Sequence, residues 1–124
     1  MPISSSLLNK PRLVQKLRKF YDYVQKNEGK VGTKTRGIDL NFNNACNLRC
    51  KYCFTNSPKG DHVKDYLDIE AIRKLADEAD ELGYFEFDLQ GGELLLQPKK
   101  LFEVLEAIRP ERFYMYLTTN GYYL

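Results

Sequence analysis

Three short segments in which apolar and polar residues alternate place the strongest constraint on how this chain folds. They cover residues 37–43, 84–90 and 112–119, with the sequences GIDLNFN, YFEFDLQ and RFYMYLTT. A period of two residues is typical of a β-strand with one buried face. Stretches with apolar residues at helical spacing separate them. The order strand–helix–strand–helix–strand predicts an α/β fold with parallel strands and right-handed crossovers.

Helix boundaries are marked by residues with known preferences for helix ends. Asp68 is a suitable N-cap for the helix after the first strand, and Gly83 is a suitable residue to end it. Pro98 fits the first turn of the next helix, and Pro110 ends it.

An amphipathic helix is expected over residues 11–27, before the first strand. Its apolar positions form one stripe: Leu13, Val14, Leu17, Phe20, Tyr21 and Val24. The basic residues Lys10, Arg12, Lys16, Arg18 and Lys19 fall largely off this stripe, which favours a solvated face. Residues 10–36 contain nine basic and two acidic residues, and such a basic arm also suits an acidic partner or a peptide. Residues 1–36 are therefore separated as a basic N-terminal tail and helix.

The composition is that of a globular protein, with 43% hydrophobic and 29% charged residues. No apolar run approaches the roughly 20 residues of a membrane span, and the first residues lack the apolar region of a signal peptide. We therefore expect a cytoplasmic protein in a reducing compartment, with no membrane partner. The tyrosines come with no RNA-binding signature, so nucleic acid is not the expected partner.

All three cysteines lie within eight consecutive positions, directly after the first predicted strand. Cys46, Cys50 and Cys53 have the spacing Cys-x3-Cys-x2-Cys, and their odd number excludes complete pairing in disulfides. Thiolates are soft ligands that select zinc, copper(I) or iron–sulfur clusters. A cubane [4Fe–4S] cluster held by three cysteines keeps one iron open for a ligand from solution. Such an open position is the arrangement of a catalytic site rather than of a structural one.

The same cysteines allow a second interpretation. His62 would complete a Cys3His zinc site, because structural zinc takes four ligands. The chain would then be a non-enzymatic metal-binding or interaction module, with the basic helix 11–27 as its docking element. The metal content distinguishes the two: iron with sulfide in the first, one zinc in the second.

The sequence CNLRCKYC resembles the cluster-binding motif of the radical S-adenosylmethionine (radical SAM) enzymes, with Tyr52 at the aromatic position before the third cysteine. The resemblance implies that Cys46, Cys50 and Cys53 hold a [4Fe–4S] cluster, and that S-adenosylmethionine binds the fourth iron. It further implies a 5′-deoxyadenosyl radical that abstracts hydrogen from a substrate, and an external electron donor. Tyr52 would lie on the cofactor side of the loop.

The sequence LQGGELLL resembles the second-strand Gly-Gly-Glu-Pro motif of the same family. This implies that Gly91, Gly92 and Glu93 help to hold the amino group of the cofactor. Glycine permits close backbone approach, and a carboxylate accepts hydrogen bonds from an ammonium group. Leu94 stands where the family often has proline.

The sequence YLTTNGYYL resembles the third-strand end of the SPASM/twitch-bearing group, whose members carry a further cysteine-rich domain. The resemblance implies cofactor contacts for Thr118, Thr119 and Asn120. Members of this group often act on peptides or in cofactor maturation, and the basic arm would suit a peptide substrate. The sequence itself does not name the substrate or a catalytic residue.

The resemblance covers residues 37–124 and implies the N-terminal half of a partial (β/α)6 TIM-like barrel. Only the first three strands are found, so we expect a fragment of a radical SAM core. In such barrels the site lies at the C-terminal ends of the strands. The cysteines, the Gly-Gly-Glu sequence and the Thr-Thr-Asn sequence each lie at the C-terminal end of a predicted strand.

Overall fold

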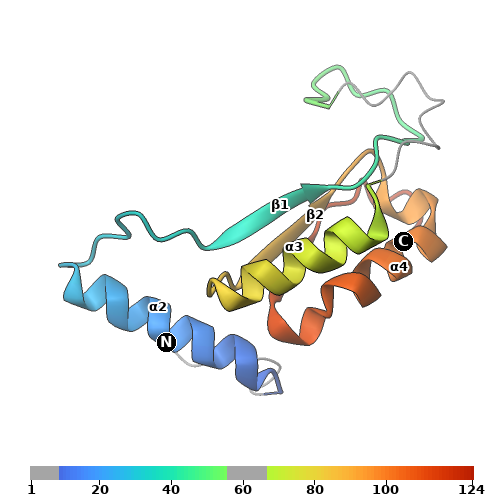
Figure 1. The fold of residues 1–124 in the computed structure, drawn as a ribbon. Coiled ribbons are helices and arrows are strands. Elements are labelled where there is room, and N and C mark those ends of the chain that lie inside the picture. The colour runs from blue at the N-terminus through green and yellow to red at the C-terminus, as the bar shows by residue number, and fades with distance from the viewer. Residues whose placement is uncertain (1–8, 56–66) are drawn as a thin grey trace.

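A three-stranded parallel sheet with two helices on one face forms the centre of the computed structural model, which describes residues 9–55 and 67–124 (Figure 1). The strands lie in the order β1-β2-β3, and all pairs are parallel. The elements are α2 (Pro11–Lys26), β1 (Gly37–Asn41), α3 (Ile69–Glu81), β2 (Glu86–Gln90), η3 (Leu94–Leu96), α4 (Pro98–Ile108), η4 (Pro110–Arg112) and β3 (Tyr114–Leu117). The expected α/β order with parallel strands is confirmed, and the sheet is open.

Helix boundaries follow the predicted signals. The Asp68 carboxylate accepts a hydrogen bond from Ala71 N at 3.1 Å and caps α3, as predicted. Gly83 has φ +85°, a left-handed conformation that suits the residue after a helix. Pro98 is in the first turn of α4.

Each strand is shorter than its alternating pattern predicts. β1 ends at Asn41 because the next residues turn toward other segments: Phe42 O accepts from Leu67 N, and Asn43 O accepts from Gly92 N. β3 begins only at Tyr114, because Arg112 and the residues before it form the turn η4. The alternating pattern continues past the strand ends, where single backbone hydrogen bonds remain, such as Phe85 N to Arg36 O at 2.8 Å and Thr118 N to Leu89 O at 3.1 Å.

The two faces of the sheet differ in character. α3 and α4 cover one face, and the core between them and the sheet contains Leu40, Phe87 and Leu89. Asp39, Asp88 and Tyr116 pair in register on the three strands and lie on the other face, which neither helix covers. A sheet face that carries carboxylates is suited to polar ligands rather than to a second apolar layer.

α2 crosses the end of the sheet at which β2 and β3 begin. The Phe20 ring meets the Phe85 ring edge-on, with centroids 5.1 Å apart. Lys10 Nζ donates to the carbonyl oxygens of Pro110 and Phe113 at 3.0 and 2.9 Å.

Among the described residues, every helix is too short or too polar to span a membrane.

The prediction of a solvated position for Lys16 is wrong. Its side chain is buried, with the residue only 3% exposed, and its Nζ lies 2.8 Å from Asp80 Oδ1 and 3.9 Å from the centre of the Phe113 ring. Tyr21, predicted in the apolar stripe, is 62% exposed instead. The helix packs through the side that carries Leu13 and Lys16. This is because Asp80 of α3 supplies an anion there, and Phe113, the residue after η4, supplies an aromatic ring.

Asp80 joins α2 to α3 electrostatically. It also accepts from Arg12 Nε at 3.1 Å. Burial would raise the pKa of Asp80, but the contacts with Lys16 and Arg12 outweigh this effect and lower that pKa. Burial lowers the pKa of Lys16, although its pairing with Asp80 works in the opposite direction.

Asp80→Asn should therefore destabilise the chain by on the order of 3 kcal/mol at pH 7, since it leaves Lys16 buried without its anion. The pKa of Asp80 is lower in the folded than in the unfolded chain. Its contribution is complete above the unfolded pKa and is lost as the pH falls through the folded pKa, so the difference from wild type should shrink on acidification. Urea unfolding at several pH values measures this. Glu78→Gln, in an exposed pair with Lys74, is the control and should change stability by less than about 0.5 kcal/mol. Equal stability of Asp80→Asn and wild type at pH 7 would contradict the assignment.

β3 is an edge of the described sheet, and its exposed apolar residues favour association of this chain when it is studied by itself. Leu117→Lys should reduce concentration-dependent self-association, measured by sedimentation velocity, because it places a charge on that edge. Leu82→Lys, at the end of α3 and even more exposed, should have no such effect. A wild-type chain that stays monomeric at all concentrations would contradict this prediction.

Candidate functional site at the carboxyl ends of the strands

The ends of β1 and β2 are joined by backbone hydrogen bonds. Gly92 N donates to Asn43 O at 3.1 Å, and Glu93 N donates to Ala45 O at 2.7 Å. A Cβ on Gly91 would lie 2.7 Å from Asn43 O, and a Cβ on Gly92 would overlap Ala45 O. The two glycines are therefore required for close backbone approach, and in this structure their neighbour is the segment that leads into the cysteines.

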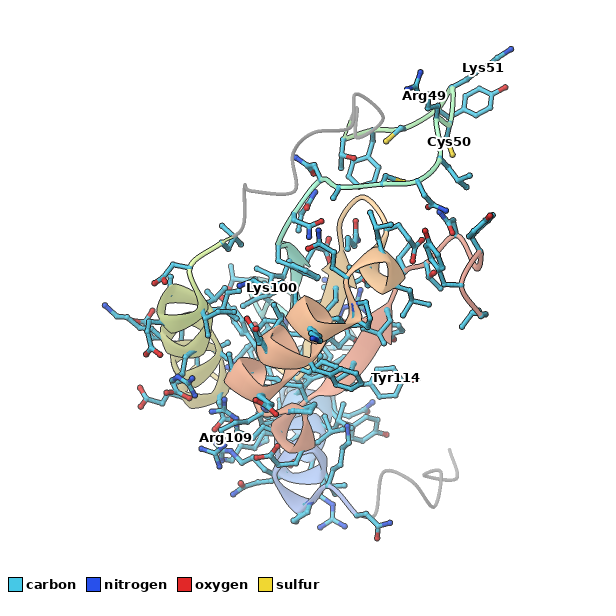
Figure 2. All side chains as sticks on the ribbon, turned by 90° about the vertical axis from the view of Figure 1, so that its right-hand side faces the viewer. Arg49, Cys50, Lys51, Lys100, Arg109 and Tyr114 are labelled. Atoms are coloured by element: carbon cyan, nitrogen blue, oxygen red, sulfur yellow. The ribbon has the colours of Figure 1, made fainter. Side chains whose placement is uncertain are left out.

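The cysteine loop extends beyond the strand ends, with Arg49, Cys50 and Lys51 far from the sheet (Figure 2). None of the three cysteines is in a disulfide, and Cys50 is exposed while Cys46 and Cys53 are partly buried. Contacts within the loop hold two of them: Leu48 N lies 3.5 Å from Cys46 Sγ, Cys53 N donates to Cys50 O at 3.3 Å, and Cys53 Sγ lies 3.3 Å from Thr55 Oγ1.

The described residues do not contain a preformed metal site. No group of three or more His, Cys, Asp or Glu side chains within residues 9–55 and 67–124 is arranged to hold a metal ion. His62, the fourth ligand of the zinc interpretation, lies outside the described residues. The donor set itself fits an iron–sulfur cluster, since it consists of three cysteine sulfurs within eight positions.

Tyr52 lies at the tip of the loop and is 93% exposed. Phe54, close to it in sequence, is also exposed. The structure therefore does not bring Tyr52 together with the other residues that the sequence selected.

The Glu93 carboxylate joins the ends of β2 and β3. Its Oε1 accepts from Thr119 Oγ1 at 2.6 Å and from Leu95 N at 3.0 Å, and its Oε2 accepts from Asn120 N at 2.7 Å. Glu93 is only 2% exposed. Burial would raise its pKa, but these three hydrogen bonds outweigh burial and lower the pKa. The carboxylate is therefore charged at neutral pH.

Asn120 continues this connection to the cysteine loop. Its Nδ2 donates to Asn47 Oδ1 at 3.0 Å. Thr118 lies on the open side of the sheet, where its Oγ1 is 3.4 Å from Asp88 Oδ1. The structure thus brings Gly91–Glu93 and residues 118–120 together at the base of the cysteine loop.

Sequence reasoning missed Asn43, Ala45 and Asn47, which connect the three motifs. Asn43 is buried, and its Oδ1 accepts from Ala45 N at 3.2 Å. The run of asparagines around the first cysteine, NFNNACN, was a usable signal, because asparagine side chains often bond to nearby backbone in turns. Leu94, where the family often has proline, is buried in the core.

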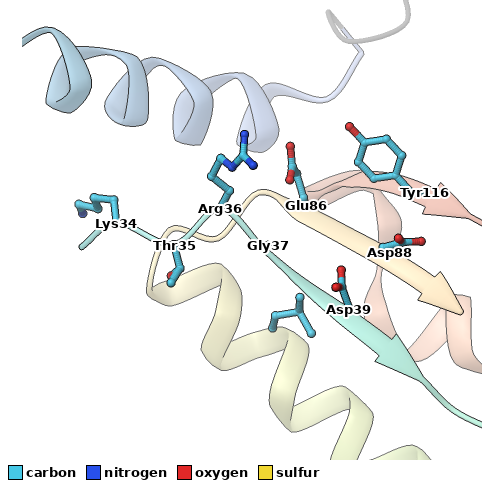
Figure 3. A pocket seen from close by; sticks show the side chains of 9 residues that line it. Lys34, Thr35, Arg36, Gly37, Asp39, Glu86, Asp88 and Tyr116 are labelled. Atoms are coloured by element: carbon cyan, nitrogen blue, oxygen red, sulfur yellow. The ribbon is translucent and has the colours of Figure 1, made fainter. Parts of the chain in front are cut away.

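An open pocket of about 550 Å³ lies on the uncovered face of the sheet, toward the amino ends of β1 and β2 (Figure 3). Asp39, Asp88 and Tyr116 from the three strands line it, together with Glu86 and Arg36. The hydrogen bond from Gln90 Nε2 to Asp88 Oδ2, at 2.8 Å, lies between this pocket and the Gly-Gly-Glu turn.

Thr119→Val should raise the pKa of Glu93, because it removes one of three donors to the carboxylate. It should also reduce stability at pH 7 by about 2 kcal/mol, the value of a hydrogen bond to a charged group. The glutamate carboxyl carbon, followed by NMR through a pH titration, reports the pKa. Thr118→Val is the matched control and should leave the pKa of Glu93 unchanged. A Glu93 titration that is the same in Thr119→Val as in wild type would contradict the assigned role.

Comparison with known proteins agrees with this arrangement. The profile of the family described as "Radical SAM superfamily" matches residues 40–124. A "Probable GTP 3',8-cyclase" of Methanocaldococcus jannaschii is 33% identical over 74% of this chain and 30% of its own length. A "5-amino-6-(D-ribitylamino)uracil--L-tyrosine 4-hydroxyphenyl transferase" of the same organism is 32% identical over 79% of this chain and 29% of its own length.

A "GTP 3',8-cyclase" of Trichodesmium erythraeum is 37% identical over 64% of this chain and 25% of its own length. The chain therefore spans less than a third of the curated relatives that it matches. Enzymes of the matched superfamily use a [4Fe–4S] cluster and S-adenosylmethionine. The matched region contains the cysteine loop and both of the strand ends that meet it, and the chain belongs to the radical SAM superfamily.

Proposed function

We propose that this chain is the N-terminal part of a radical SAM enzyme core, and that Cys46, Cys50 and Cys53 hold its [4Fe–4S] cluster. The observation that carries the proposal is the junction at the base of the cysteine loop, where the Gly-Gly-Glu turn and the end of β3 are hydrogen-bonded to the residues around Cys46. Cys46 lies within this junction, and Cys50 and Cys53 follow it within eight positions of the chain.

The cluster, with S-adenosylmethionine on its open iron, would supply a 5′-deoxyadenosyl radical for hydrogen abstraction. The chain's own residues would bind the cluster and the cofactor and orient them relative to each other. A carboxylate has about four lone-pair sites, and the three donors to Glu93 leave one for the ammonium group of the cofactor. The lowered pKa of Glu93 keeps this acceptor charged. Thr118, Thr119 and Asn120 would lie beside the cofactor at the end of β3.

The uncovered face of the sheet is the side from which a substrate would approach. Asp39, Asp88 and Tyr116 would face it there. The names of the relatives above specify different reactions, so they do not indicate which reaction this chain takes part in. Four points stay predictions: a peptide or cofactor-maturation substrate, an external electron donor, a cytoplasmic location and the division of the chain at residues 36–37. The same holds for closure into a partial (β/α)6 barrel. The zinc interpretation has no supporting contact among the described residues.

Electron paramagnetic resonance tests the proposal. The protein is reconstituted with iron and sulfide without oxygen, reduced with dithionite, and measured with and without S-adenosylmethionine. We expect about four irons and four sulfides per chain, and a [4Fe–4S]+ signal that shifts on addition of the cofactor. Cys50→Ser should lose the cluster. Glu93→Gln should keep the cluster and weaken cofactor binding about tenfold, the effect of one hydrogen bond to a charged group.

Two results would overturn the proposal. One zinc per chain without sulfide would support the non-enzymatic module. A cluster signal that does not respond to the cofactor would remove the assignment of Glu93 and residues 118–120 to cofactor binding.

A further inference from the structure

We infer that Asn120 latches the cysteine loop to the end of β3 through Asn47, and that this latch positions the cluster relative to Glu93. Asn47 directly follows the first cysteine, and 73 positions separate it from Asn120. The positioning part of this inference rests on the proposed function. The latch itself is a property of the protein without its cofactors.

The orientation of the Asn120 amide is determined by its surroundings. Its Oδ1 accepts a hydrogen bond from Tyr122 N at 3.0 Å, and a backbone N–H can only donate. The Nδ2 group is therefore the end that faces Asn47, and Asn47 Oδ1 accepts from it at 3.0 Å. The turn is held further by Gly121 N, which donates to Thr119 Oγ1 at 3.1 Å.

Asn120 contacts both of the other motifs at once. Its backbone N–H donates to Glu93 Oε2 at 2.7 Å, while its side chain binds the residue next to Cys46. The position of the cysteine loop is thereby connected to the position of the Glu93 carboxylate through one residue. The direct backbone bond from Glu93 N to Ala45 O lies on the other side of Cys46. Cys46 is thus held between two fixed points, Ala45 and Asn47.

This placement affects how the two cofactors meet. Thiolates of the loop would hold the cluster, and the strand ends would hold S-adenosylmethionine. A reacting pair must be held within a fraction of an ångström of its productive geometry, and a displacement of about 1 Å can cost a hundredfold in rate. Asn120 and Asn47 are positioning residues in this sense, because they act through the loop and not on the reacting atoms.

Two variants at position 47 separate the latch from its electrostatic surroundings. Asn47→Leu keeps the shape of the side chain but removes the acceptor for Asn120 Nδ2, so the contact is lost. Asn47→Asp adds a charge at the same contact but keeps the acceptor for Asn120 Nδ2. Only Asn47→Leu should break the latch, and an effect of charge should appear only in Asn47→Asp.

The first measurement is hydrogen exchange of the protein without cofactors, followed by mass spectrometry. In Asn47→Leu, exchange over residues 44–50 should be faster by about fivefold, the effect of one hydrogen bond. The contact is exposed to solvent, so no larger effect is expected. Exchange in α3 should not change. In Asn47→Asp, exchange over residues 44–50 should match wild type.

The second measurement is a titration of the reduced, reconstituted protein with S-adenosylmethionine, read from the shift of the cluster signal. In Asn47→Leu the midpoint should rise about fivefold at unchanged iron and sulfide content, and in Asn47→Asp it should stay near the wild-type value. A role in folding alone would lower the cluster content and leave the midpoint of the remaining protein unchanged.

The outcomes distinguish this inference from the proposed function. Wild-type exchange over residues 44–50 in Asn47→Leu would overturn the latch. Faster exchange with an unchanged cofactor midpoint would overturn the positioning role. A wild-type protein that binds no cluster would overturn the proposed function, and the exchange measurement would then decide on the latch alone.

Discussion

The charged carboxylate of Glu93 lies almost completely out of solvent, and the arrangement of the strand ends depends on it. Removing a carboxylate from water costs several kcal/mol unless donors surround it. Leu95 N comes from the turn after Glu93 itself, whereas Thr119 Oγ1 and Asn120 N come from the end of β3. Glu93 is therefore stable only where the ends of β2 and β3 are correctly placed.

The two ends of the sheet carry different sets of contacts. At the end where β2 and β3 begin, Lys16, Asp80 and Phe113 attach α2 to the helical layer. At the other end, Glu93, Asn120 and Asn47 connect the three motifs. The core of Phe87, Leu89 and their neighbours lies between. The contacts that attach α2 and the contacts that join the three motifs thus lie at opposite ends of the strands, and in α/β barrels the sites lie at the carboxyl ends.

Local patterns were enough to predict the order of elements, their parallel pairing and the motifs at the strand ends. The Asp68 cap and the position of Gly83 were also predictable, because the residues that determine them are neighbours in sequence. The burial of Lys16 was not predictable in this way, because its partner Asp80 is 64 positions away in the sequence. Its position on the helix also falls among the other basic residues, which indicates a polar face. The contact of Gly92 with Ala45 was missed for the same reason, since glycine shows that something comes close but does not show what.

The joint between β1 and β2 and the joint between β2 and β3 are made of different chemical groups. The first uses backbone atoms of Asn43, Ala45, Gly92 and Glu93. The second is centred on the Glu93 carboxylate, which accepts from the Thr119 hydroxyl and from Asn120 N. At Gly92 no side chain fits, because it would occupy the space of the Ala45 carbonyl. The side chain of Ala45 takes no part in the backbone bond, but it is buried, with the residue only 1% exposed. Natural versions of this loop should therefore be nearly invariant at position 92 and should vary only among small residues at position 45.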